Sequence, residues 1–72
     1  MTQQEKIALL EDLLELEGGS LEPEMDLKGI AAYDSMAKLS LIVMMDEVMG
    51  KRLTGEDIQG FNTVQDILEF MD

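Results

Sequence analysis

The chain contains no cysteine and no histidine, which removes two of the side chains that most often perform chemistry in proteins. Without cysteine, neither a disulfide nor a thiolate metal site can stabilise the fold. Without histidine, the commonest general base is missing, so we expect no enzyme activity. Tryptophan is also absent, and aromatic residues make up only 4% of the 72 residues. The core is therefore predicted to be aliphatic and rich in methionine.

Basic residues are also scarce, with five Lys and Arg against sixteen Asp and Glu and a formal net charge of −11 at pH 7. A field of this sign repels nucleic acids and anionic lipids, and it favours basic patches on other proteins. No apolar run approaches the roughly 18 residues that span a bilayer, and the N-terminus does not resemble a signal peptide. We therefore expect a cytoplasmic monomer of one domain, residues 1–72, with no nucleic acid partner and no stable membrane insertion.

The first periodic segment predicts a helix over roughly residues 3–17. Thr2 and Glu5 have the spacing of a capping box, and a glycine pair supplies a stop after the last periodic residue. Apolar residues recur at helical intervals along one side of this segment. The opposite side is expected to lie in water, and it contains Glu11, Asp12 and Glu15.

A segment without sustained periodicity, residues 18–33, separates this helix from the next. Loops longer than about 12 to 15 residues are uncommon and often functional, although a plain crossover between two helices also explains the segment. Its acidic residues Glu22, Glu24 and Asp26 alternate, but they lack the full calcium-loop pattern, so we expect a solvated loop and no metal. The apolar residues that could anchor the loop to the core are Leu21, Met25, Leu27 and Ile30.

Residues 35–49 predict a second helix that is apolar nearly all round and ends at Gly50. One stripe suits a core, and it contains Ala37, Leu41, Ile42, Met45, Val48 and Met49. A second stripe is a candidate docking face, unless the helix is central and packed on two sides. This second stripe contains Met36, Leu39 and Val43, beside Ser40 and Glu47.

Two shorter helices complete an all-α bundle of three principal helices and one short helix. Thr54 is predicted to cap the short helix, which runs through Gln59. Thr63 and Asp66 have the spacing to open the final helix. The apolar face of that helix contains Val64, Ile67, Leu68 and Met71.

The serine of Asp34-Ser35-Met36 stands where the long loop gives way to the second helix. Asp and Ser are both preferred N-cap residues, so capping alone explains the pair. A hydrolytic role fails because a nucleophilic serine needs an oriented base and the chain has no histidine. Lys38 has the spacing of a Ser-x-x-Lys pair, but 72 residues leave little room for a substrate cleft. A hydroxyl at a helix N-terminus can instead receive a phosphate ester from another enzyme, because the backbone amides there stabilise the added charge.

The chain resembles the acyl carrier protein family in length, acidity, helix order and loop length. The residues that support the resemblance run from Leu27 through Asp34-Ser35-Met36 to Gly50, and from Asn62 to Leu68. Members of the family hold a 4′-phosphopantetheine group on the serine of an Asp-Ser-Leu motif at the start of the second helix, and Ser35 occupies that position. The resemblance therefore implies an acyl-carrier-like bundle with Ser35 as the attachment residue, flanked by Asp34 and Met36.

The resemblance also implies a set of partners. A phosphopantetheinyl transferase, using coenzyme A and Mg²⁺, would esterify the serine, and the thiol of the attached arm would carry acyl groups as thioesters. Enzymes of fatty acid, related lipid or polyketide synthesis would receive these groups, and the core of the bundle would enclose the acyl chain. The implied docking contacts on these enzymes are Met36, Leu39, Val43, Asp46 and Glu47.

The sequence departs from the usual pattern of the family around the serine. Met36 replaces the common Leu, Tyr33 precedes Asp34, and Lys38 stands where many fatty-acid carriers are more acidic. These departures favour a specialised pathway. A polyketide carrier is one alternative, whereas a peptidyl carrier is disfavoured because Asp precedes the serine. From another class, an unmodified acidic helical adaptor that binds a basic protein is the alternative.

Overall fold

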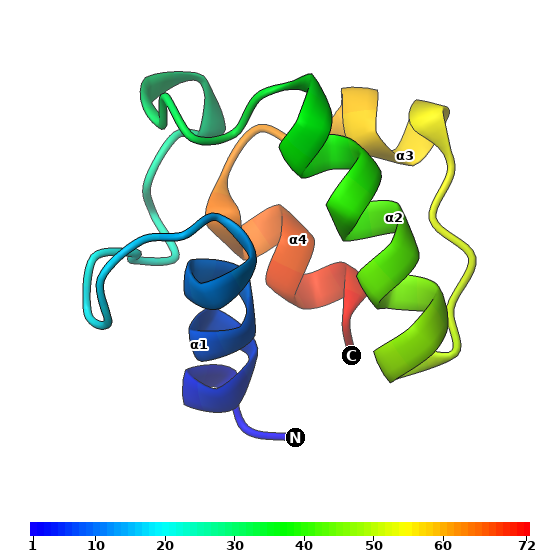
Figure 1. Ribbon diagram of the computed structural model, residues 1–72, viewed down its shortest axis with the longest axis horizontal. Coiled ribbons are helices and arrows are strands. Elements are labelled where there is room, and N and C mark those ends of the chain that lie inside the picture. Colours follow the sequence, from blue (N-terminus) through cyan, green and yellow to red (C-terminus); the bar gives the residue numbers. More distant parts are fainter.

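The computed structural model describes residues 1–72 and contains four α-helices, one short 3-10 helix and no strand (Figure 1). The all-α prediction is confirmed. Helix α1 packs against both α2 and α4. The elements are α1 (Gln3–Leu13), the 3-10 helix η1 (Leu27–Gly29), α2 (Ser35–Met49), α3 (Gly55–Gly60) and α4 (Val64–Phe70).

The start of α1 follows the predicted capping box. The Thr2 amide donates to the Glu5 carboxylate at 2.8 Å, and the Glu5 amide donates to the Thr2 hydroxyl at 3.2 Å. These reciprocal bonds satisfy two backbone donors that the first helical turn leaves without partners. The hydrogen bonds of the Glu5 carboxylate lower its pKa, with the bond from the Thr2 backbone amide as the largest cause.

The predicted end of α1 at residue 17 is wrong, because the helix stops at Leu13. Glu15 takes a left-handed backbone conformation with φ of 59°. Its amide donates to the Asp12 carbonyl at 3.1 Å, and the Leu16 amide donates to the Glu11 carbonyl at 2.8 Å. These two bonds form a Schellman motif, which ends a helix without needing the glycines that follow.

The prediction that Glu11 faces water is also wrong, since this side chain is only 6% exposed. Beyond α1 the chain folds back over the end of the helix. The Glu11 carboxylate there accepts hydrogen bonds from the Gly19 amide at 2.9 Å and from the Leu21 amide at 3.0 Å. A carboxylate that receives two backbone bonds can be buried, and here it holds the start of the long loop against α1.

The long loop is bonded to the segment before α4. The Leu27 amide donates to the Asn62 carbonyl at 2.9 Å, and the Val64 amide donates to the Met25 carbonyl at 3.0 Å. A single antiparallel bridge between Asp26 and Thr63 lies between these bonds. Of the predicted loop anchors, Leu21, Leu27 and Ile30 are buried and Met25 is half-buried.

The two shorter helices agree with the predicted signals. Thr54 caps α3, which runs one residue further than predicted, to Gly60. Helix α4 begins after Thr63, and the Asp66 carboxylate accepts bonds from the Asn62 amide at 2.8 Å and the Thr63 amide at 3.0 Å. These two backbone bonds lower the pKa of Asp66.

The core forms where α1, α2, α4 and the long loop meet. Leu41 and Met45 of α2 and Leu10 of α1 are at most 2% exposed. The prediction of an aliphatic core is confirmed, but leucine and isoleucine outnumber methionine in it. The buried apolar residues are Leu10, Leu14, Leu21, Leu27, Ile30, Ala37, Leu41, Met45, Leu53, Ile58, Val64, Ile67, Leu68 and Met71.

The end of α4 is bonded to two lysines from distant parts of the chain. The buried Lys6 of α1 forms an ion pair with Asp72, which lowers the pKa of the Asp72 side chain. Lys51, just after α2, donates from its ammonium to the Phe70 carbonyl at 2.8 Å and to the Asp72 carbonyl. Both ammonium groups are thus occupied within the fold.

Candidate functional site

The residue that caps α2 is Asp34, and the sequence had left this role open between Asp34 and Ser35. The Asp34 carboxylate accepts a bond from the Ala37 amide at 2.9 Å, and the Asp34 carbonyl accepts one from the Lys38 amide at 3.0 Å. Because the aspartate supplies the capping oxygen, the serine hydroxyl is not needed for this purpose.

Ser35 is the first residue of α2, and its side chain is exposed. Its hydroxyl takes no part in the side-chain hydrogen bonds of the chain, and the amides of Ser35 and Met36 lack a partner within the helix. Free amides at a helix N-terminus carry partial positive charge and bind phosphate oxygens. The donors at the start of α2 therefore fit a phosphate ester on Ser35.

An exposed apolar stripe runs down α2 from this N-terminus. Met36 is 71% exposed, Leu39 is 60% exposed and Val43 is 53% exposed. The opposite side of the helix is buried through Ala37, Leu41 and Met45. The helix is therefore packed on one side, and the alternative of a helix packed on two sides is wrong for this chain.

Val48 lies on the predicted core side of α2, seven residues after Leu41, but it is exposed. It is 53% exposed, and it lines a shallow groove with Val43 and Met44. It also lines an open groove with Ala8 and Leu9 of α1, so the start of α1 lies beside Val48 without burying it. Of the other residues predicted for the core stripe, Ile42 and Met49 are half-buried.

Two acidic residues near the end of α2 lie at the two edges of the stripe. Asp46 and Glu47 are both exposed. They line an open groove with Arg52, an exposed cation that the sequence reasoning did not single out. In the long loop, the alternating acids do not come together into a group that could hold a metal ion.

Comparison with known families gives one result over nearly the whole chain. Residues 7–71 match the family described as "Phosphopantetheine attachment site". The chain belongs to this phosphopantetheine attachment family. A comparison with curated proteins returned no match.

Proteins of the phosphopantetheine attachment family hold 4′-phosphopantetheine covalently and act as carriers, so the chain is an acyl-carrier-type protein and not an enzyme. Carriers of this kind work with a phosphopantetheinyl transferase and with biosynthetic enzymes. None of the helices is long and apolar enough to cross a membrane. The acyl-carrier resemblance inferred from the sequence is confirmed at this level.

A pair of side chains beside the start of α2 was not predicted from the sequence. The carrier places the Lys38 ammonium 5.4 Å from the centre of the Tyr33 ring, which is the geometry of a cation–π contact. The Tyr33 hydroxyl is buried and has no hydrogen-bond partner. Burial of this side chain raises its pKa.

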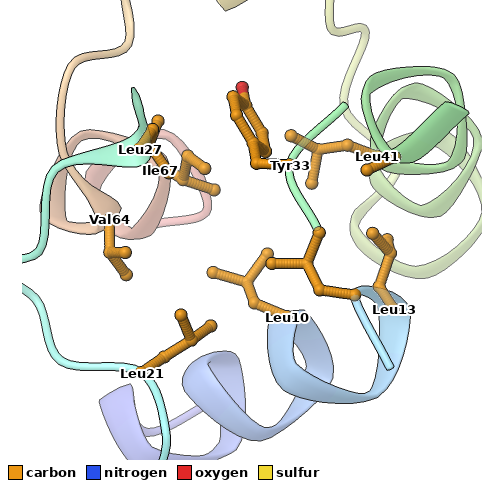
Figure 2. A pocket seen from close by; sticks show the side chains of 10 residues that line it. Leu10, Leu13, Leu21, Leu27, Tyr33, Leu41, Val64 and Ile67 are labelled. Atoms are coloured by element: carbon orange, nitrogen blue, oxygen red, sulfur yellow. The ribbon is translucent and has the colours of Figure 1, made fainter. Parts of the chain in front are cut away.

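The core of the carrier contains a small apolar cavity between α1, α2 and α4 (Figure 2). The cavity has a volume of about 10 Å³, which is room for roughly one water molecule. Methionine is absent from its lining, although the sequence predicted a core rich in methionine. The lining residues are Leu10, Leu13, Leu14, Leu21, Leu27, Tyr33, Ala37, Leu41, Val64 and Ile67.

Proposed function

We propose that residues 1–72 form one acyl carrier domain and that Ser35 is the residue to which 4′-phosphopantetheine is attached. The observation that supports Ser35 is the structure of the start of α2. Asp34 caps the helix, so the Ser35 hydroxyl is exposed and makes no hydrogen bond within the chain. The family match over residues 7–71 supports the nature of the group. Ser20 and Ser40 also lie at exposed positions, but neither begins a helix.

The attachment needs little from the chain beyond the serine and its surroundings. The Ser35 oxygen bonds to phosphorus, the phosphoanhydride bond of coenzyme A breaks, and the adenosine bisphosphate part leaves. The hydroxyl proton passes to a base of the transferase. The amides of Ser35 and Met36 then stabilise the charge of the phosphodiester. The attached arm supplies a thiol that holds acyl groups as thioesters.

The exposed stripe of α2 is the docking surface in this proposal. Apolar side chains at this level of exposure are unusual on the surface of a small monomer, and they begin beside the attachment residue. Acidic side chains next to the stripe would attract basic patches on the transferase and on later enzymes, which raises association rates. The residues proposed for docking are Met36, Leu39, Val43, Asp46 and Glu47.

A specialised biosynthetic pathway suits this carrier better than housekeeping fatty acid synthesis. The first turn of α2 contains no acidic residue, and Lys38 adds positive charge there. Partners that recognise an acidic first turn would therefore dock less well, because charge complementarity selects partners as well as speeding their approach. The pathways that we propose are specialised fatty acid, related lipid and polyketide synthesis.

Intact-mass measurement tests the attachment residue directly. The purified chain is incubated with a promiscuous phosphopantetheinyl transferase, coenzyme A and Mg²⁺. We expect the mass to increase by one phosphopantetheinyl group for the wild type and for Ser40→Ala, a matched control on the same helix, but not for Ser35→Ala.

A mass gain that persists in Ser35→Ala would move the attachment to another residue. Absence of any gain in a folded wild-type chain would favour the unmodified acidic adaptor instead. Circular dichroism of each variant establishes that the helices are intact before the masses are compared.

A further inference from the structure

Lys38 is a cation without a carboxylate partner in a chain that has sixteen acidic residues. The one ion pair of the structure joins Lys6 to Asp72, and Lys51 is bonded to backbone carbonyls at the end of α4. Lys38 is half-buried, and its ammonium lies over an aromatic ring, where the ring quadrupole attracts it. Its charge is therefore available to an anion that the chain itself does not supply.

The ammonium of Lys38 lies at the N-terminal end of α2. Residues three apart on a helix are neighbours, with about 5 to 6 Å between their Cβ atoms, so Lys38 lies next to Ser35 on the helix surface. Helical side chains also lean toward the N-terminus. The Lys38 ammonium contacts the ring of Tyr33, a residue that precedes the helix, so the Lys38 side chain leans toward this end.

We propose that Lys38 binds the phosphodiester on Ser35 and so fixes the direction in which the phosphopantetheine arm leaves α2. This inference rests on the proposed attachment to Ser35. A phosphodiester carries one negative charge, and the free amides of the first turn provide only partial charges to balance it. The Lys38 ammonium adds a full charge and a charge-assisted hydrogen bond within reach of the same oxygen atoms.

The surrounding charges make this pairing useful to the fold. Attachment changes the net charge from −11 to a still more negative value, beside the carboxylate of Asp34 that caps the helix. Without a nearby cation, the new charge would repel that carboxylate. With Lys38 as its partner, the first segment of the arm lies on the side of α2 that faces Tyr33, and the docking stripe stays uncovered.

Comparison of the modified and unmodified forms tests the pairing. Both forms are prepared for the wild type, Lys38→Met, Lys38→Arg and the matched control Lys28→Met, which removes a lysine from the long loop. The melting temperature of each pair is measured at low salt, and ³¹P spectra of the modified forms are recorded.

We expect modification to raise the melting temperature more in the wild type than in Lys38→Met, by roughly 1 to 8 °C, the range for an exposed ion pair in a domain of this size. Lys38→Arg and Lys28→Met should behave as the wild type. The ³¹P resonance should shift in Lys38→Met and not in Lys28→Met. High salt should reduce the difference, because it screens the pair.

Equal effects of modification in the wild type, Lys38→Met and Lys28→Met, with an unmoved ³¹P resonance, would overturn the role of Lys38 and leave the attachment to Ser35 intact. If the wild type gains no mass, the attachment itself fails and the inference about Lys38 falls with it. Lys38→Gln, a second neutral variant, replaces Lys38→Met if the latter does not fold.

Discussion

Replacement of Glu11 by alanine is expected to destabilise the carrier strongly, although the sequence alone assigns this residue to the solvated side of α1. The Glu11 carboxylate accepts two backbone bonds at 2.9 and 3.0 Å, and only 6% of the residue is exposed. Hydrogen bonds to a charged group contribute about 1.5 to 3 kcal/mol each, and a buried amide left without a partner keeps its full desolvation cost.

The magnitude follows from the surroundings of the two amides. Leu21 is buried, so its amide stays without a partner in Glu11→Ala, whereas the exposed Gly19 regains a bond from water. We therefore expect a net loss of about 3 kcal/mol. A chain of 72 residues has a total stability of about 4 to 11 kcal/mol. The corresponding fall in melting temperature is roughly 12 to 24 °C.

The assay compares thermal unfolding of Glu11→Ala with that of Asp12→Ala, which removes the same charge from an exposed neighbour in α1. Only the first should unfold early, and hydrogen exchange should accelerate at the amides of Gly19 and Leu21. Glu11→Gln keeps an acceptor oxygen and should lose less stability. Equal melting temperatures for the two alanine variants would refute the role of the buried carboxylate.

Two further predictions concern the surroundings of the attachment site. Tyr33→Phe removes a buried hydroxyl that has no hydrogen-bond partner and keeps the ring under Lys38. Its free energy of unfolding should rise by about 1 kcal/mol, and its melting temperature by roughly 4 to 8 °C. A fall in melting temperature would mean that the hydroxyl has a partner. Burial raises the pKa of Tyr33 above its ordinary value of 10.0. The stability that the neutral Tyr33 side chain contributes is therefore complete below pH 10.0 and is lost as the pH rises through the folded-state pKa. Alkaline melting curves should show this loss in the wild type and not in Tyr33→Phe. Leu39→Glu places a charge in the docking stripe and should slow modification by the transferase roughly tenfold, which corresponds to about 1.4 kcal/mol. Gln4→Glu adds the same charge on α1 and should leave the rate unchanged. Equal initial rates for the two variants would argue against docking through the stripe.

Local signals in the sequence predicted most of the helical structure. The bounds of α2 agree with the prediction because a strong N-cap precedes it and Gly50, with a left-handed φ of 65°, follows it. The caps of α3 and α4 are equally local, since each depends on residues three apart. These features need no knowledge of how distant segments pack, so they can be recognised along the chain.

The errors arise where distant contacts or an unusual backbone decide the structure. Glu15 takes a left-handed conformation that glutamate disfavours, so the end of α1 has no recognisable residue signal. The burial of Glu11 depends on the loop that folds back onto it, and helical periodicity does not report such contacts. The contact of Lys38 with Tyr33 crosses the helix boundary, where the spacing rule for helical neighbours does not apply.

Helix α2 has almost no side that is free to change. One side fills the core, the other exposes an apolar stripe, and Ser35 and Lys38 occupy the turn at its start. Substitutions should therefore be tolerated least on the core side of α2 and most on the exposed side of α1, which contains Gln4. A new pathway could recruit the carrier by exchanging a few stripe residues, because those positions can change their partners without disturbing the core beneath them.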